Sequence, residues 1–203
     1  MIRAIIFDLG GVLVRTVDFT PRERLASRLD MDRFALEDLI FGGESGDRAQ
    51  KGEISLAQHR ENLAARLGFS VQQVKDLVDE FFAGDVLDTA LVDYVRKLHE
   101  HYKTALLSNA WDDARQVIVE RWHIDDAFDE LIISSELGMV KPDPRIFHLA
   151  LDMLDVEANQ AVFVDDMQRN VDGARKVGLE GIRFQNPQQV KLDLEQLLDN
   201  HKG

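Results

Sequence analysis

The sequence predicts an α/β protein with a Rossmann-like parallel sheet, helices on both faces of that sheet, and an inserted all-helical cap. Two observations predict this fold class. Short apolar runs alternate with amphipathic helical stretches over most of the chain, whereas the segment 15–85 shows helical periodicity throughout. With 203 residues, the chain is long enough to form a hydrophobic core and to carry a modest insertion.

Five apolar runs have the length of strands and are rich in Ile, Val, Leu or Phe without polar alternation, as is typical of strands buried on both faces. They are Ala4–Phe7, Thr104–Leu107, Leu131–Ile133, Ala161–Val164 and Gly181–Phe184. Amphipathic stretches between the later runs are expected to be helices, namely Asp88–His101, Asp112–Trp122, Pro144–Leu154 and Asn170–Val177. This alternation of strand and helix predicts a parallel sheet.

The insertion carries helix-end signals but no convincing strand. Ser55 with Gln58 and Ser70 with Gln73 fit capping boxes, and Gly68 and Gly84 lie where helices are expected to end. The glycine-rich stretch 42–52 is expected to be a flexible loop tip. The predicted division is a catalytic core of residues 1–14 and 86–203, with residues 15–85 as the helical cap.

Composition narrows the possible functions. The 24 basic and 37 acidic residues give a formal charge of −13, which argues against a nucleic-acid-binding protein because phosphate neutralisation needs a basic face. With no cysteine, disulfides, thiolate metal sites and cysteine nucleophiles are excluded. No membrane helix or signal peptide is predicted, so we expect a cytoplasmic protein with no membrane partner.

Polar residues follow four of the predicted strands. Asp8 follows the first, Ser108 and Asn109 the second, and the pair Asp165–Asp166 the fourth, while Lys141 lies in the segment after the third. In an open parallel sheet the loops at the carboxyl ends of the strands converge on one crevice, where ligands bind. These groups are therefore expected to meet at one edge, although they are far apart in sequence.

The chemistry of these groups indicates phosphoryl transfer. Carboxylates forced together are costly unless a cation lies between them, and with oxygen ligands and no cysteine that cation is expected to be Mg²⁺. Ser108 and Lys141 are suitable partners for phosphoryl oxygens. An Asp can attack phosphorus to give an aspartyl-phosphate.

These four motifs, in order along nearly the whole chain, resemble the haloacid dehalogenase (HAD) superfamily, in the subgroup with a helical cap after the first strand. The resemblance implies that Asp8 is the nucleophile, that Ser108 and the Asn109 backbone bind phosphate, and that Lys141 is the third-motif lysine. It also implies that Asp165–Asp166 is the acidic metal-binding motif, with Asp166 the direct ligand. Asp8 and the backbone carbonyl of Gly10 would complete the metal site.

One position departs from the family pattern. The residue two after the nucleophile is usually a second Asp that acts as general acid and base, and here it is Gly10. Such a group is worth roughly 10²–10⁴-fold in rate. Three explanations stay open: a leaving group that needs little protonation, a substitute acid such as Asp18 or another cap residue, or an enzyme that is slow or inert. A branch resembling glucose-1-phosphate phosphatases also has glycine here.

The leading hypothesis is therefore a Mg²⁺-dependent phosphatase, a monomer or homodimer, acting on a small phosphomonoester such as a sugar phosphate. One alternative is a 2-haloacid dehalogenase, against which the retained Asp165–Asp166 argues because that class needs no metal. The other is a catalytically impaired protein that binds phosphate esters and regulates.

Other prominent side chains have simpler interpretations. Trp111 is expected either to wall the substrate pocket or to pack, with no preference between the two. Surface or structural roles are expected for His59, His123, His148 and His201, whereas His99 and His101 are two residues apart and are not expected to form a ligand pair on a helix.

Overall fold

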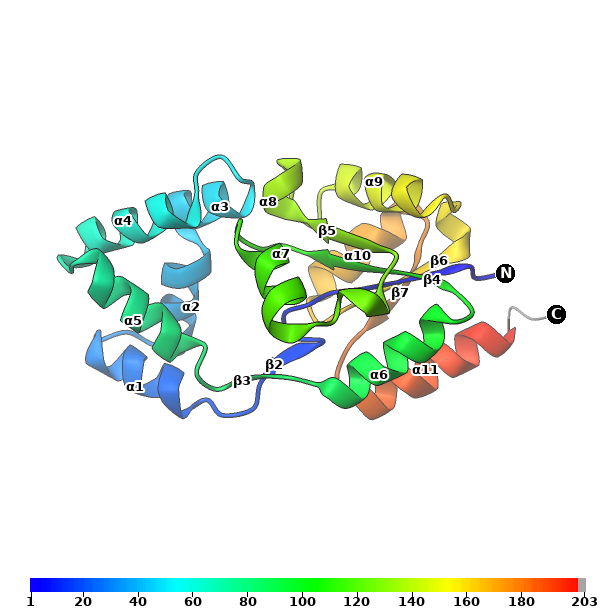
Figure 1. Ribbon diagram of the computed structural model, residues 1–203, viewed down its shortest axis with the longest axis horizontal. Coiled ribbons are helices and arrows are strands. Elements are labelled where there is room, and N and C mark those ends of the chain that lie inside the picture. The colour runs from blue at the N-terminus through cyan, green and yellow to red at the C-terminus, as the bar shows by residue number, and fades with distance from the viewer. Residues whose placement is uncertain (201–203) are drawn as a thin grey trace.

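The computed structural model describes residues 1–200, and its centre is a five-stranded parallel sheet (Figure 1). The strands lie in the order β5-β4-β1-β6-β7, and every pairing is parallel. Their bounds are β1 Ala4–Phe7, β4 Lys103–Ser108, β5 Glu130–Ile133, β6 Ala161–Asp165 and β7 Glu180–Arg183. The predicted α/β fold class is confirmed, and each predicted apolar run overlaps one of these strands.

Helices cover both faces of the sheet (Figure 1). On one face lie α6 (Thr89–His99) and α11 (Pro187–Asn200), and on the other lie α9 (Pro144–Leu154) and α10 (Gln168–Val177). Side chains alternate along a strand, so Ile5 and Phe7 enter the first core while Ala4 and Ile6 enter the second. The expectation that every strand is buried on both faces is wrong for β7, in which Glu180 and Arg183 are exposed.

The segment between β4 and β5 is only partly the helix that the sequence predicts over Asp112–Trp122. It contains a short α7 (Ala114–Gln116), a π-helix η1 (Val117–Trp122) and a 3₁₀ turn η2 (Asp125–Ala127). Two further short elements are α8 (Ser134–Leu137) and the 3₁₀ turn η3 (Ala158–Gln160).

The insertion forms five helices with a core of their own. They are α1 (Thr20–Arg28), α2 (Arg33–Phe41), α3 (Gly43–Gln50), α4 (Leu56–Leu67) and α5 (Val71–Phe81). Leu25, Leu36, Leu77 and Phe81 are fully or almost fully buried in this cap core. Both predicted capping boxes begin their helices, and Gly68 ends α4 with a φ of 67°, as predicted.

Two expectations about glycines in the insertion are wrong. The stretch 42–52 contains helix α3 rather than a flexible tip, and the glycines permit close packing. A Cβ at Gly46 would lie 2.4 Å from the carbonyl oxygen of Phe41, and one at Gly52 would lie 1.9 Å from that of Ser135. Gly84 is not the end of α5, which is capped by Phe82. It lies instead against the Asp18 carbonyl.

A two-stranded antiparallel ribbon joins the cap helices to the sheet domain (Figure 1). It consists of β2 (Val14–Thr16) and β3 (Asp85–Leu87), so the expectation of no strand in the insertion is wrong at both ends. Thr16 Oγ1 donates to Asp85 Oδ1 at 2.7 Å, and Arg15 forms an ion pair with Asp88. These strands are too short to show a pattern in the sequence, and they form because the two ends of the insertion meet.

No helix among residues 1–200 has the length and apolar character needed to cross a bilayer.

Candidate active site

Three carboxylates meet at the carboxyl ends of the two central strands β1 and β6. Asp8 directly follows β1, and its backbone N–H donates to the carbonyl of Val164 at 2.9 Å. Asp165 ends β6 and Asp166 follows it. Each of the three side chains offers an oxygen, and these oxygens all lie within 4.8 Å of one another. The site therefore lies where the strand order reverses, the usual place for ligands in such sheets.

The ammonium group of Lys141 lies among these carboxylates and is almost completely buried. Its Nζ is 2.7 Å from Asp8 Oδ1, 2.8 Å from Asp165 Oδ2 and 2.8 Å from the carbonyl oxygen of Leu107. An ammonium has three protons, so these three oxygens occupy all of them. In this arrangement Lys141 orients Asp8; a direct contact from Lys141 to a phosphoryl oxygen stays a prediction.

Asn109 fixes the backbone of Lys141. Its Oδ1 accepts from the Lys141 N–H at 2.8 Å, and its Nδ2 donates to the Lys141 carbonyl at 3.0 Å. Thus the Asn109 side chain joins the loop after β4 to the segment that carries the lysine. This leaves the predicted phosphate contact to the Asn109 backbone.

The two neighbouring acidic residues have different surroundings. Asp165 is completely buried, and its two oxygens also accept from the Met167 N–H and from Asn170 Nδ2, at 2.8 to 3.1 Å. Asp166 is only partly buried. Because both oxygens of Asp165 already accept protein hydrogen bonds, Asp166 is the better placed of the two to be a direct metal ligand, although both were predicted at the metal site.

The electrostatics of the site favour an additional cation. Burial is the largest cause that raises the pKa of Asp8 to about 8, and Asp165 and Asp166 raise it further, while Lys141 opposes them. Burial, together with the charge of Asp165, also raises the pKa of Asp166. Three ionised carboxylates and one ammonium leave two negative charges uncompensated, so a bound divalent cation would restore neutrality and keep Asp8 ionised.

The residues present fit a hard cation such as Mg²⁺. Asp8 and Asp166 supply carboxylate oxygens, the ligands that Mg²⁺ prefers. Asn170 Oδ1 is buried beside this cluster without a hydrogen-bond partner, and it could accept a hydrogen bond from a metal-bound water. Gly11 has a φ of +82°, and a Cβ there would lie 2.4 Å from Asp166 Cγ, so only glycine lets Asp166 approach this loop.

The neighbouring Gly10 has space around it. It is exposed, and a Cβ at this position would meet no atom within 4 Å. Asp18, considered as a substitute acid, is exposed; its Oδ1 accepts from the Thr20 N–H at 2.9 Å, and hydrogen bonding to Thr20 lowers its pKa. A general acid needs a raised pKa, so these surroundings do not suit Asp18 for that task.

The loop after β4 also contacts the cap. Ser108 ends β4 and is buried. Trp111 packs into the cap core, where its ring stacks on Phe41 with centroids 5.5 Å apart. Of the two interpretations of Trp111 left open by the sequence, the structure shows the packing role.

The buried histidine of the cap is structural, as expected. His59 Nε2 lies 3.0 Å from the Ile40 carbonyl and Nδ1 lies 2.9 Å from Ser45 Oγ, which places the proton on Nε2. Burial lowers the pKa of His59. His201 lies outside the described residues.

Sequence reasoning gave no role to three residues that shape the site: Gly11, Asn170 and the side chain of Asn109. The paired glycines after Asp8 could have signalled a close approach of the backbone. Asn170 follows Asp165 by five residues, but no short sequence pattern joins Asn109 to Lys141, because the sheet brings them together.

Comparison with known proteins agrees with this geometry. Residues 2–178 match the haloacid dehalogenase-like hydrolase family. This chain is 31% identical to bifunctional epoxide hydrolase 2 of Sus scrofa. The match covers 97% of this chain but only 39% of that longer protein. The chain is 26% identical to the D-ribitol-5-phosphate phosphatase of Bacteroides thetaiotaomicron, over 98% of this chain and all of that protein.

Among solved structures, a HAD family enzyme from Bacteroides thetaiotaomicron, in complex with magnesium and inorganic phosphate, shares the fold. Its TM-score is 0.75 at 24% identity, and the match covers 91% of this chain and 95% of that one. Since the family match extends over most of the chain and agrees with the fold and the cluster at the strand ends, this protein belongs to the haloacid dehalogenase-like hydrolases.

Proposed function

We propose that this hydrolase is a Mg²⁺-dependent phosphatase that cleaves a small phosphomonoester such as a sugar phosphate. The observation that carries the proposal is the charge balance of the site. Three carboxylates lie beside one ammonium group, and that group is within hydrogen-bonding distance of two of them. That arrangement favours the binding of a divalent cation beside Asp8, the proposed nucleophile, which Lys141 holds in place. The similarity to a ribitol-5-phosphate phosphatase supports the same activity.

In the proposed reaction, an Asp8 oxygen attacks the phosphorus atom and the bond to the leaving alcohol breaks, giving an aspartyl-phosphate. The Ser108 hydroxyl and the Asn109 N–H hold the phosphoryl oxygens, while Lys141 keeps Asp8 oriented. Water then attacks the aspartyl-phosphate, releasing inorganic phosphate and restoring the Asp8 carboxylate. Mg²⁺, held by Asp8, Asp166 and the Gly10 carbonyl, would supply positive charge against the phosphoryl oxygens.

The cap is proposed to exclude water and to select the leaving group. The insertion meets the core near the site, because the Ser134 hydroxyl donates to the Gln50 carbonyl at 2.6 Å and Leu56 N–H donates to Asp112 at 3.2 Å.

The first experiment measures phosphate released from a panel of sugar and polyol phosphates. We expect release with Mg²⁺, none with EDTA, and a loss of at least about 10³-fold in Asp8→Asn, which removes the nucleophile but keeps the side chain's size. The exposed Asp125→Asn is the matched control and should keep full activity. Release that survives both EDTA and Asp8→Asn would contradict the proposal.

Two outcomes would favour the alternatives. Chloride released from chloroacetate in EDTA would indicate a 2-haloacid dehalogenase, against which the retained Asp166 argues. Intact mass spectra after mixing with acetyl phosphate test the other alternative. A phosphorylated protein that persists would indicate that hydrolysis of the aspartyl-phosphate is impaired, which would favour the catalytically impaired regulatory protein.

A further inference from the structure

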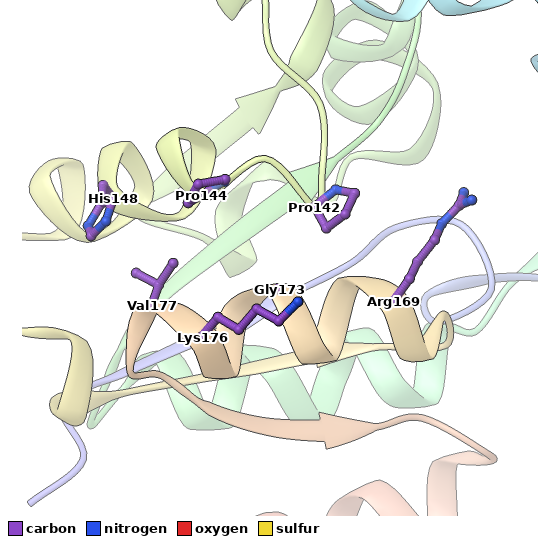
Figure 2. Close-up of a pocket in the computed structure, with 7 residues that line it drawn as sticks. All are labelled: Pro142, Pro144, His148, Arg169, Gly173, Lys176 and Val177. Carbon is purple, nitrogen blue, oxygen red and sulfur yellow. The ribbon is translucent and has the colours of Figure 1, made fainter.

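A surface groove on the sheet domain lies between α9 and α10, and none of its lining residues is one of the candidate active-site residues. Its volume is about 390 Å³, within the range of roughly 300–1,000 Å³ that is usual for small-molecule pockets. Figure 2 shows the lining residues, which come from α9, α10 and the segment between β5 and α9. The argument uses Pro142, His148, Arg169, Gly173, Lys176 and Val177.

Packing explains why the groove exists. Gly173 lies on the face of α10 that meets Pro142, and a Cβ there would be 2.7 Å from Pro142 Cβ and 3.2 Å from Phe147. The missing side chain lets α10 approach this segment closely. It also leaves a hollow between Arg169 and Lys176, one turn away on each side.

The polar side chains of the groove are basic or neutral. Arg169, Lys176 and His148 line it, and no Asp or Glu is among its lining residues. None of these three side chains makes a hydrogen bond or ion pair with any residue in the described part of the chain. Two acidic residues close to them in sequence have partners: Asp143 pairs with Arg145, and Asp172 accepts from Gln168 and lies 3.9 Å from Arg175.

An unpaired basic groove is unusual in a protein whose formal charge is −13. The acidic surroundings exclude an extended polyanion such as nucleic acid, which needs a wide basic surface. A small anion needs only the local groups, and guanidinium and ammonium side chains both bind phosphate well.

The spacing of the basic residues indicates how many anionic groups the ligand carries. Arg169 and Lys176 are seven residues apart on α10, which corresponds to about 10.5 Å along the helix axis. Two phosphate groups joined by a short carbon skeleton match that distance better than one phosphate. Pro142 and Val177 offer apolar surface to the skeleton.

We propose that this groove is a second binding site, separate from the catalytic carboxylates, for a small organic bisphosphate. Its lining adjoins the catalytic segments in sequence, because Pro142 is bonded to Lys141 and Arg169 precedes Asn170. A ligand in the groove would therefore contact the two segments that hold Lys141 and Asp165 in place.

Isothermal titration calorimetry of the full chain in EDTA at low salt tests this site without turnover. The probes are fructose 1,6-bisphosphate, inorganic phosphate and fructose. We expect the bisphosphate to bind at least about tenfold more tightly than phosphate, and fructose not to bind. In the double variant Arg169→Gln/Lys176→Gln, the bisphosphate affinity should fall by at least about tenfold.

The matched control is Lys97→Gln/Arg121→Gln, which removes the same charges from exposed positions on the elements α6 and η1, across the sheet. It should bind the bisphosphate as the unaltered chain does. The proposal would be overturned if the groove variant bound the bisphosphate as tightly as the unaltered chain, or if both double variants lost affinity equally. It would also be overturned if the unaltered chain bound bisphosphate and phosphate with equal affinity, or did not bind the bisphosphate. The assay measures binding without turnover, so its result does not depend on whether the protein is a phosphatase.

Discussion

At the scale of single residues, one ammonium group organises the candidate active site. Lys141 contacts Asp8 and Asp165, while Asp165 is held in turn by Asn170 and the Met167 N–H. Because Lys141 and Asp165 are buried and hydrogen-bonded, the carboxylate of Asp8 has little freedom to rotate away. A nucleophile benefits from this, since a fixed orientation before reaction removes part of the entropic cost of the step.

Gly10 is the residue at which the site can be tested most directly. A Cβ at this position meets no atom within 4 Å, so we expect Gly10→Asp to fold normally. If proton transfer limits the reaction, kcat for phosphate release should rise by roughly 10²-fold or more, because a positioned general acid is restored. Steady-state kinetics on the best substrate measures the effect.

Gly10→Asn is the control for this prediction, because it has nearly the same shape without a carboxyl group. We expect it to leave kcat unchanged. If Gly10→Asp is no faster than the unaltered enzyme, another group already transfers the proton or the leaving group needs none.

At the scale of elements, glycines and one histidine determine how the cap helices pack. Gly52 lies against the Ser135 carbonyl at the point where the cap meets the core, and α3 contacts α8 there. His59 joins α4 to the end of α2 and to α3, through the Ile40 carbonyl and Ser45. The cap therefore depends on a few close approaches as well as on its apolar core.

Gly52→Ala should be markedly more destabilising than Gly68→Ala, which is its control. Both glycines have positive φ, 68° and 67°, so alanine costs about 1–2 kcal/mol at either position. No atom lies within 4 Å of a Cβ at Gly68, whereas a Cβ at Gly52 would lie only 1.9 Å from the Ser135 carbonyl oxygen. The clash should bring the loss to about 3 kcal/mol or more, measured by urea unfolding. Equal losses would show that the contact carries no strain.

His59 predicts how the stability of the protein depends on pH. The unfolded chain protonates this histidine with an ordinary pKa near 6.5, while burial keeps the pKa lower in the folded protein. Between these two values the unfolded state binds more protons, so the free energy of unfolding should fall as the pH decreases below about 7. Urea unfolding between pH 8 and pH 5 measures this slope.

The control for the pH prediction is His59→Gln, which keeps a polar group but does not titrate. The variant should be less stable at pH 8, and its stability should decrease less on acidification. An identical pH slope in both proteins would show that other groups determine the acid sensitivity.

At the scale of the whole molecule, the charge of −13 opposes the binding of an anionic substrate. Positive charge is needed locally, and in the described part of the chain it comes from Lys141 among the clustered carboxylates and from Arg183, whose guanidinium donates to the Asp166 carbonyl. A bound cation would therefore have two effects: it would attract the anionic substrate, and it would reduce the repulsion between the buried carboxylates.

Mg²⁺ should consequently stabilise the folded protein. At a concentration of one hundred times Kd, a single site adds about 2.7 kcal/mol, which thermal unfolding detects as a higher Tm. Asp166→Asn should lose most of this increase, whereas the exposed control Asp125→Asn should keep it. An increase of the same size in both variants would indicate general charge screening rather than a site.

The sequence by itself determined the α/β class, the positions of the sheet strands and the residues at the strand ends. These features could be predicted because burial on both faces leaves uninterrupted apolar runs, and because parallel strands bring their carboxyl ends to one edge. The motif resemblance added roles for Asp8, Ser108, Lys141 and Asp166. Those roles stay predictions until the variants are tested.

The tertiary structure alone decided the features that depend on contacts between distant segments. They include the β2–β3 ribbon, the close packing of Gly52 against the Ser135 carbonyl, the hydrogen bonds between Asn109 and Lys141, and the basic groove. None of these has a local pattern, because the energy that stabilises each comes from a partner far away in sequence. A glycine in particular is ambiguous in sequence: the same residue allows a flexible turn or the closest packing, and only its neighbours in space decide which.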